Sequence, residues 1–323
     1  MRVLVTGGAG YIGSVLSRLL LDQGHHVRVL DSLLHGGRGL LGLFEDDGFD
    51  FVHGDIRDAS VVDGALSNID AVVHLAAIVG DPACTRQPAL TREVNLDASL
   101  QLGELCQRHG VRRLVFASTC SNYGKMEDAF RPVNEESELM PVSLYAETKV
   151  AVERTFLDTG MSDGSALTVL RFATVFGLSP RMRFDLTVNE FTAELLLKRK
   201  LAVYGEQFWR PYVHVRDAVR AIAMVLDSPP EKVRDRVFNV GDTGQNYQKG
   251  QLVDLIRGQI DGDVEIKHVR RDEDPRDYRV SFDKVRDELG FNITHTVEDG
   301  VRQIIQVLSR GVIDDYDNPR YRN

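Results

Sequence analysis

Short runs of β-branched and apolar residues alternate along the chain with longer stretches in which apolar residues recur every three or four positions. The short runs predict buried strands, and the periodic stretches predict amphipathic helices. Strands are expected at 3–6, 27–30, 51–52, 71–75, 113–117 and 167–172. Helices are expected at 12–22, 60–65, 91–109 and 145–159. This strict alternation predicts an α/β fold with a doubly wound parallel sheet.

Beyond about residue 176 the pattern becomes looser, with loops rich in Arg, Pro and Tyr. Helices are expected near 188–198, 217–226 and 251–258, and strands near 211–214 and 237–240. We therefore predict one domain over 1–176, to which late elements near 211–245 return. Residues 177–323 are expected to form mainly a smaller, interleaved C-terminal lobe.

Composition limits the classes of function that the chain can serve. The 323 residues include 39 basic and 48 acidic side chains, giving a net charge of −9, and 43% are hydrophobic. Such a chain folds into a globule, and its negative charge disfavours general binding to nucleic acid or to anionic membranes. No apolar run approaches the roughly 20 residues of a membrane span. A small-molecule partner is expected.

Cys84, Cys106 and Cys120 are widely spaced and form neither a C-x-x-C motif nor a cluster with histidine. This spacing indicates no disulfide framework and no metal site. The first residues lack the apolar stretch of a signal peptide. We therefore expect reduced thiols and a cytoplasmic protein.

A glycine-rich turn stands between the first expected strand and the first expected helix. Gly7, Gly10 and Gly13 allow the backbone to turn sharply and to approach a pyrophosphate at the N-terminus of the helix. Asp31 follows the second expected strand, eighteen residues after Gly13, where a carboxylate can bind both hydroxyls of a ribose. The next two residues are serine and leucine rather than arginine, which favours NAD over NADP. The turn predicts a Rossmann-type dinucleotide site.

A second group of residues has the spacing of a proton-transfer site. Tyr145 and Lys149 share a helix face, because they lie four residues apart. The ammonium, together with an oxidised nicotinamide, can lower the pKa of the phenol from about 10 and create a phenolate base. Thr119, after the strand at 113–117, can orient or relay the same proton. The alternative is a solvated lysine beside a tyrosine that packs on the sheet.

Together with these groups, Gly54-Asp55-Ile56, His74-Leu75-Ala76-Ala77 and Val94-Asn95 resemble motifs of the extended short-chain dehydrogenase/reductase family. The similar branch contains the NAD-dependent nucleotide-sugar epimerases and dehydratases. The resemblance implies catalysis by Thr119, Tyr145 and Lys149. It implies that NAD contacts Gly7, Gly10, Tyr11, Ile12, Gly13, Asp31, Asp55, Ile56, Leu75, Ala76, Ala77, Val79, Asn95, Ser118, Tyr145, Lys149, Phe172 and Val175.

The resemblance continues into the second lobe, which it makes the binding lobe for a nucleotide-diphosphate sugar. Residues 171–177 are similar to the Arg-x-Phe-Asn-x-Tyr-Gly segment of the family, with Thr174 in place of Asn. This replacement puts the usual hydrogen bond to substrate in doubt. Substrate contacts are expected from Cys120, Ser121, Thr174, Arg181, Arg183, Asn189, Tyr204, Arg210 and Arg271.

Members of this branch begin by oxidising a sugar carbinol, usually at C4. The 4,6-dehydratases carry Asp-Glu directly after the threonine, where this chain has Cys120 and Ser121, so we expect no dehydration. Epimerases that act at C3 and C5 place a cysteine at the position of Ser121. Cys120 is then either a weak acid or a packing residue. We expect a 4-epimerase, with a C4 dehydrogenase or 4-ketoreductase as the alternative and a non-catalytic dinucleotide sensor disfavoured by the Tyr/Lys pair.

Two further expectations concern the sugar and the assembly. Residues 176–189 and 274–280 resemble members that act at C4 of nucleotide-activated heptoses, so the substrate is expected to be a hexose or a heptose. Arg181 and Arg183 either reach this sugar or its phosphates, or brace the loop. The resemblance also implies a homodimer through the helices at 91–109 and 145–159. Apolar residues beyond one face of these helices are Leu96, Leu100, Leu102 and Val152.

Overall fold

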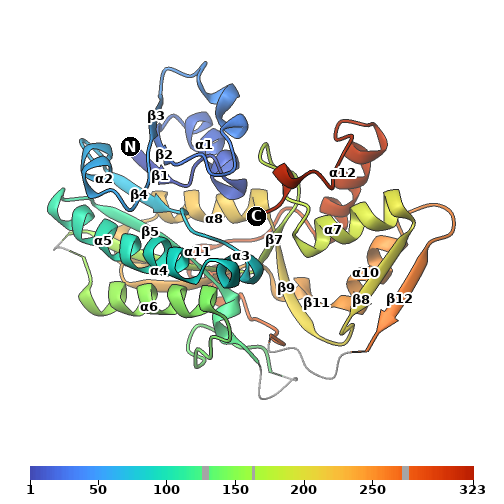
Figure 1. Cartoon of the computed structure of the whole chain (residues 1–323). Coiled ribbons are helices and arrows are strands. Elements are labelled where there is room, and N and C mark those ends of the chain that lie inside the picture. The colour runs from blue at the N-terminus through green and yellow to red at the C-terminus, as the bar shows by residue number, and fades with distance from the viewer. Residues whose placement is uncertain (126–130, 162–163, 271–275) are drawn as a thin grey trace.

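A computed structural model describes residues 1–125, 131–161, 164–270 and 276–323 (Figure 1). Its centre is a parallel seven-stranded sheet with the order β10-β6-β5-β4-β1-β2-β3. The strands are β1 (Arg2–Thr6), β2 (His26–Asp31), β3 (Phe49–His53), β4 (Ala71–His74), β5 (Arg113–Thr119), β6 (Ala166–Phe172) and β10 (Arg236–Val240). This order confirms the doubly wound Rossmann-type sheet, and all the carboxyl ends of its strands lie on one edge.

Helices cover both faces of this sheet, as β1 illustrates. Val3 and Val5 face one core, with α1 (Tyr11–Asp22) and α8 (Val215–Asp227) packed over it, whereas Leu4 faces the core on the other side. That second core is covered by α2 (Ala59–Ala65), α5 (Ala98–Arg108) and α6 (Leu144–Thr159), which Figure 1 shows along one side of the sheet. Among the described residues, no helix combines the length and the apolarity that crossing a bilayer demands.

The helix expected at 91–109 is built from three consecutive pieces. It starts as α4 (Pro88–Arg92), passes through a π-helical turn at Glu93–Asp97 and continues as α5. Leu102 on α5 and Val152 on α6 are fully buried against the sheet, so they belong to the protein's own core and not to an outward face. Leu96 and Leu100 remain half-buried.

The second lobe contains two small sheets. One is three-stranded, with β11 (Asn246–Gln248), β9 (Trp209–His214) and β7 (Thr174–Phe176), and the other pairs β8 (Lys200–Tyr204) with β12 (Glu265–Val269). Around their shared apolar core pack α7 (Thr187–Ala193), α10 (Lys249–Arg257) and α12 (Val297–Ser309). The elements at 188–198, 211–214 and 251–258 agree with expectation, whereas β7, β8, β11, β12 and α12 were not predicted.

The two lobes are interleaved in the chain. Strand β10 pairs with β6 as an edge strand of the main sheet, and α8 packs on α1, although both follow second-lobe strands. Strands β9 and β11, from the same late stretch, stay in the smaller sheet. Smaller elements are a 3-10 turn at Arg38–Leu43, α3 (Asp81–Arg86), a 3-10 turn at Cys120–Tyr123, α9 (Pro230–Val233), α11 (Asp283–Leu289) and 3-10 turns at Thr243–Gln245 and Pro319–Tyr321. The division near residue 176 stays a prediction.

Candidate active site

The glycine-rich turn connects β1 to α1 at the carboxyl edge of the sheet. Gly7 has a φ of +73°, and a Cβ there would lie 2.8 Å from the amide nitrogen of Ala76. A Cβ on Gly13 would lie 2.3 Å from the carbonyl oxygen of Gly7. No side chain caps α1, whose N-cap is Gly10. The turn therefore presents backbone N–H groups and the positive end of a helix, which fits a dinucleotide pyrophosphate.

Asp31 ends β2 directly beside this turn. Its carboxylate accepts hydrogen bonds from the amides of Ala9 (2.9 Å) and Leu33 (2.8 Å). Burial raises the pKa of Asp31, while these hydrogen bonds and the charge of Arg181 act in the opposite direction. The carboxylate is thus held in one orientation next to the glycines, as a ribose ligand must be.

Of the two alternatives for Arg181, its contacts favour bracing of the loop, and its charge also acts on Asp31. It is 7% exposed, and its Nη2 donates to the carbonyl oxygen of Arg322 at 3.2 Å. Its buried Nε has no partner among the described residues. Burial, followed by the charge of Arg183, lowers the pKa of Arg181 to about 10, and Asp31 offsets part of this effect.

The other expected cofactor residues lie on the same edge, but not all of them offer free groups. Asn95 is buried. Its Oδ1 accepts from the amide nitrogen of Ile78 at 2.7 Å, and its Nδ2 donates to the carbonyl oxygen of the same residue at 2.9 Å. It therefore braces the loop after β4. Asp55 is bound by the side chain of Arg57, and this hydrogen bonding lowers the pKa of Asp55. Leu75, Ala76, Ala77, Val79, Ile12 and Val175 are half-buried, and Tyr11, Ile56 and Phe172 are buried.

Tyr145 and Lys149 lie on the face of α6 that meets the end of β5. Lys149 is 2% exposed, and its Nζ donates to the carbonyl oxygen of Ala117 at 2.8 Å and lies 6.0 Å from the centre of the Tyr145 ring. Burial lowers the pKa of Lys149 to about 8. Burial also raises the pKa of Tyr145, and Arg183 acts against this. The two side chains meet as the i, i+4 spacing predicts, but without cofactor the phenol is a weaker acid than usual.

Thr119 is the last residue of β5, and the chain turns at once into the 3-10 turn Cys120–Tyr123. The Thr119 hydroxyl accepts from the Ser121 amide (3.1 Å) and pairs with the Ser121 hydroxyl (2.9 Å). Cys120 is buried, and its thiol donates to the carbonyl oxygen of Arg171 at 3.2 Å. Burial raises the pKa of Cys120 well above its ordinary value. Of the two alternatives for Cys120, the geometry favours the packing residue, because the thiol points away from the edge.

Ser118 does not present its hydroxyl to this edge. It donates to Glu153 Oε2 at 2.9 Å, and Glu153 in turn receives Arg171 Nε at 2.9 Å. Sequence reasoning missed Glu153. Its position one further helical turn along the face of Tyr145 and Lys149 is the signal that could have found it.

The second lobe carries Arg210 and Tyr204, two of the residues expected to contact a substrate. Arg210, on β9, is 8% exposed, and its guanidinium lies 5.5 Å from the centre of the Tyr278 ring. Arg276 reaches across to Asp81 on α3 with an N–O distance of 2.6 Å. Tyr204 ends β8 and is 47% exposed. Arg271 lies outside the described residues.

The loop after β7 forms hydrogen bonds with residues of both lobes. The Tyr11 hydroxyl donates to the carbonyl oxygen of Gly177 at 2.6 Å. Asn189 is fully buried and uses its amide on the backbone of Gly177 and Arg183, so it is not placed to contact a substrate as expected. Arg183 pairs with Asp185 through two hydrogen bonds of 2.9 and 2.7 Å.

Thr174 begins β7 beside Tyr212 of β9 and is half-buried. The combined arrangement is a dinucleotide-type turn, a Tyr/Lys pair and a lobe carrying arginines around one edge of the sheet. Such an arrangement can hold NAD and an anionic ligand on either side of a proton acceptor.

Comparison with known proteins agrees with this arrangement. Residues 3–241 match the family described as "NAD dependent epimerase/dehydratase family". The chain belongs to this family. A UDP-glucose 4-epimerase of Corynebacterium glutamicum is 30% identical, with 92% of each chain covered.

Two similar solved structures are UDP-glucose 4-epimerases. That of Thermus thermophilus in complex with NAD has a TM-score of 0.83 and 30% identity, covering 97% of this chain and all of the other. That of Thermotoga maritima with UDP-glucose has a TM-score of 0.84 and 28% identity over the same shares. Membership of the NAD-dependent epimerase/dehydratase family confirms the expected family, enzyme class and cofactor NAD.

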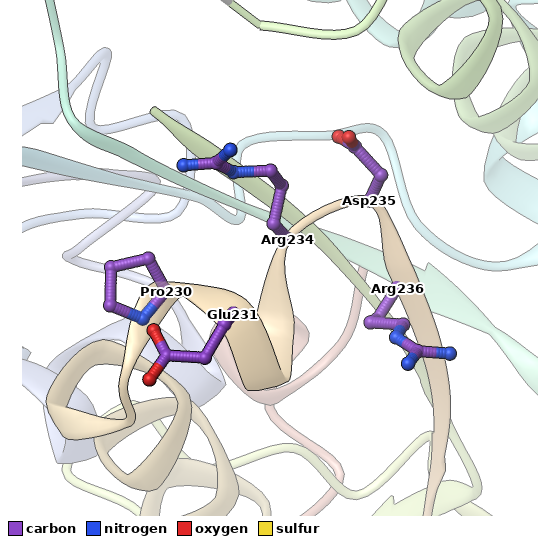
Figure 2. A pocket seen from close by; sticks show the side chains of 5 residues that line it. All are labelled: Pro230, Glu231, Arg234, Asp235 and Arg236. Carbon is purple, nitrogen blue, oxygen red and sulfur yellow. The ribbon is translucent and has the colours of Figure 1, made fainter. Parts of the chain in front are cut away.

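A surface hollow of about 630 Å³ lies away from the glycine turn and the Tyr145–Lys149 pair. It is formed by α9 and the beginning of β10, at the amino end of the sheet. The charged ends of Glu231, Arg234, Asp235 and Arg236 diverge instead of converging on one point (Figure 2). This hollow is therefore not part of the candidate site.

Proposed function

We propose that the protein is an NAD-dependent nucleotide-sugar 4-epimerase. The observation that carries the proposal is Lys149, anchored on the carbonyl oxygen of Ala117 with the Tyr145 ring one helical turn before it. This arrangement supports a role for Tyr145 as a phenol whose pKa the lysine can lower, at the edge of the sheet where Thr119 and the glycine turn lie. The 4-epimerases among the relatives support the same activity.

In the proposed reaction the Tyr145 oxygen accepts the proton of the C4 hydroxyl, while Thr119 holds that hydroxyl in place. NAD, when bound at the glycine turn, would supply the hydride acceptor and donor that this chemistry at C4 requires. Because burial raises the pKa of Tyr145, the phenol needs nearby positive charge. Lys149, with its pKa near 8, is mainly protonated at pH 7, and Arg183 also lowers the pKa of Tyr145. After the 4-keto sugar has turned its other face, Tyr145 gives the proton back to the C4 oxygen as that carbon is reduced to an alcohol again.

The residues after Thr119 support epimerisation over dehydration. Elimination of water needs an acid and a base beside C5 and C6. Cys120 is buried with a raised pKa, and the Ser121 hydroxyl is paired with that of Thr119. Neither side chain can serve as a carboxylate base.

The test is incubation of the purified protein and catalytic NAD with a panel of nucleotide sugars, beginning with UDP-glucose and including a nucleotide-activated heptose. NMR of the products is expected to reveal the C4 epimer without accumulation of NADH. Accumulating NADH and a ketone would instead establish the C4 dehydrogenase alternative. Loss of one water would establish a dehydratase, and NAD binding without any turnover would establish a sensor.

Two arginines bear on which sugar the protein prefers. Arg183 is close enough to Tyr145 to change its pKa, whereas Arg181 lies with Asp31. We therefore propose that Arg183 acts on the sugar side and Arg181 on the cofactor side. If the heptose is preferred over UDP-glucose in the panel, replacement of Arg183 by Met should remove that preference, and replacement of Arg181 should not.

We further propose a cytoplasmic homodimer. Leu96 in the π-helical turn, Leu100 on α5 and Leu157 on α6 are half-buried apolar residues that a pair of helices from a second copy would cover. Three free, buried cysteines fit a reducing compartment. Light scattering is expected to give twice the chain mass of 36.1 kDa. A monomer at micromolar concentration would exclude the dimer.

A further inference from the structure

A network of buried polar groups lies directly behind the Tyr145–Lys149 pair. At its centre the carboxylate of Glu153 receives two nitrogens of Arg171 on β6, and one of them, Nε, lies 2.9 Å from Oε1. The Ser118 hydroxyl donates to Oε2 at 2.9 Å, and Asn122 donates to Ser118 at 3.1 Å. Glu153 is 1% exposed and Arg171 is 4% exposed. The pair thus connects α6 to the residues that flank Thr119.

The network continues to the edge strand of the sheet. Arg171 Nη1 donates to the Tyr123 hydroxyl at 2.9 Å, and the guanidinium lies 5.3 Å from the centre of the Tyr123 ring. The Tyr123 hydroxyl donates to Asn239 Oδ1 on β10 at 2.8 Å. Three strands, the turn after Thr119 and α6 are therefore joined through one guanidinium.

Stability alone does not account for this arrangement. Removing two charges from water is unfavourable, and a well-packed apolar pair at a buried site is often as stable as an ion pair or more so. An ion pair with defined hydrogen bonds does, however, fix the relative position of the elements that carry it. Here Glu153 is carried by α6, the helix that holds Tyr145 and Lys149. Arg171 binds Tyr123 in the 3-10 turn that follows Thr119.

We propose that Glu153 and Arg171 are positioning residues, which set the location of α6 against the end of β5 and so hold Tyr145 and Lys149 in register with Thr119. Neither residue touches the reacting atoms. They act through Ser118 and Tyr123 on one side and through the helix on the other. The kinetic part of this inference rests on the proposed function, whereas the geometric part does not.

The test is a cycle of Glu153→Gln, Arg171→Met and the double variant, each saturated with NAD. Each single variant leaves one charge or one set of donors unpaired and is expected to lower the melting temperature. The double variant removes both charges and is expected to recover most of that loss. Its kcat for UDP-glucose epimerisation should still fall about a hundredfold with KM within about threefold, because misplacement of reacting groups by 1 Å has about that effect.

A second readout does not depend on turnover. The ultraviolet absorbance of the Tyr145 phenolate in the NAD complex, taken as the difference from Tyr145→Phe in the same background, gives its titration midpoint. In the double variant this midpoint should rise by about one pH unit, because a displaced α6 carries the Tyr145 phenol away from the positive charge of bound NAD and frees Lys149 from its anchor on the Ala117 carbonyl oxygen. Tyr123→Phe, which keeps the ring and removes only the bridging hydroxyl, should show a smaller change in the same direction while remaining folded.

The control is Asp50→Asn, which breaks the exposed Arg28–Asp50 ion pair between β2 and β3 and should leave both readouts unchanged. If the double variant regains both melting temperature and kcat, or if the phenolate midpoint stays at the wild-type value, the positioning role is wrong. If the double variant does not fold, an unchanged midpoint in Tyr123→Phe overturns the proposal and a raised one supports it. A wild-type protein that turns over no sugar in the panel contradicts the proposed function alone, and the midpoint still decides the inference.

Discussion

The cofactor side and the substrate side of the site hold their polar groups in different ways. Around the glycine turn the contacts come from the backbone, and Asp31 is fixed by two main-chain amides. Across the edge the second lobe offers long side chains, which are paired with acids or stacked on rings. Arg276 bonds Asp81, Arg183 bonds Asp185, and Arg210 lies against Tyr278.

The difference has consequences for rigidity and for specificity. Backbone donors in a turn with a strained glycine cannot be rearranged without refolding the turn, so that side suits one unvarying ligand. Arginines held by ion pairs can exchange one anion for another, so that side can adapt to different anionic ligands. The Tyr145–Lys149 pair stands between the two regions.

The largest effect is expected at this junction. Tyr145→Phe removes the proton acceptor and should lower kcat by about 10³-fold. The affinity for NAD should change by less than about threefold, because the glycine turn is untouched. Product formation by NMR and calorimetric titration with NAD check the two parts. Residual activity near the wild-type level would show that another group is the base.

The next largest effect is expected at Gly7 in the glycine turn. Comparing two glycines separates the cost of a positive φ from the cost of steric contact with a neighbouring backbone. Gly7→Ala puts an alanine at a φ of +73° with its Cβ 2.8 Å from a backbone nitrogen, and it should lower the unfolding free energy by about 3 kcal/mol and NAD affinity by about a hundredfold. Gly24→Ala is the matched control, since Gly24 has a φ of +79° with nothing within 4 Å. It should lower stability by only about 1 kcal/mol. Equal losses in the two variants, measured by denaturant unfolding, would mean that the close approach of β1 and β4 is unimportant.

A pH dependence should follow from the burial of Lys149. Its pKa is about 8 in the fold against 10.5 when unperturbed, so between these values the unfolded chain binds more protons. The unfolding free energy of the cofactor-free protein should therefore rise with pH across this window, by up to about 1.4 kcal/mol per pH unit from this group. Lys149→Met should lack that rise. Parallel curves for the two proteins would mean that Lys149 is not desolvated.

The smallest effect is expected on the substrate side. Arg276→Met breaks a half-exposed ion pair, so stability should change by less than about 1 kcal/mol. KM for the nucleotide sugar should rise about threefold to tenfold with kcat nearly unchanged, because an anionic substrate loses a binding group and not a reacting one. Arg302→Met, at the exposed ion pair with Asp299, is the control and should alter neither constant. A fall in kcat alone would place Arg276 nearer the chemistry than proposed.

Much of the fold follows from short-range patterns. The strands at the centre of the sheet, the turn at Gly7 and the pairing of Tyr145 with Lys149 depend on spacing within one element or two neighbouring ones. Such features repeat with the period of a strand or a helix, and they survive any choice of tertiary partner. That is why the Rossmann-type sheet and its dinucleotide turn could be predicted.

The roles of individual polar residues could not be predicted in the same way. Asn95 and Asn189 have side-chain amides that could bind a ligand. Both instead form hydrogen bonds with the backbone of loops that lie further along or back in the chain. Arg181 donates to the carbonyl oxygen of Arg322, 141 residues later in the chain. A polar group binds whichever partner the folding of remote segments brings within reach, and no local period encodes that partner.

The amino-acid sequence by itself therefore determined the strands and helices of the main sheet, the glycine turn and the placement of Tyr145 and Lys149 on one helix face. Only the tertiary structure decided that Arg181 is buried, that Cys120 is enclosed, and that Glu153 and Arg171 meet behind Tyr145 and Lys149. The reason is physical. Backbone conformation responds to neighbours within a few positions, whereas burial, pKa and ion pairing depend on groups that come together only when the sheet closes over its helices.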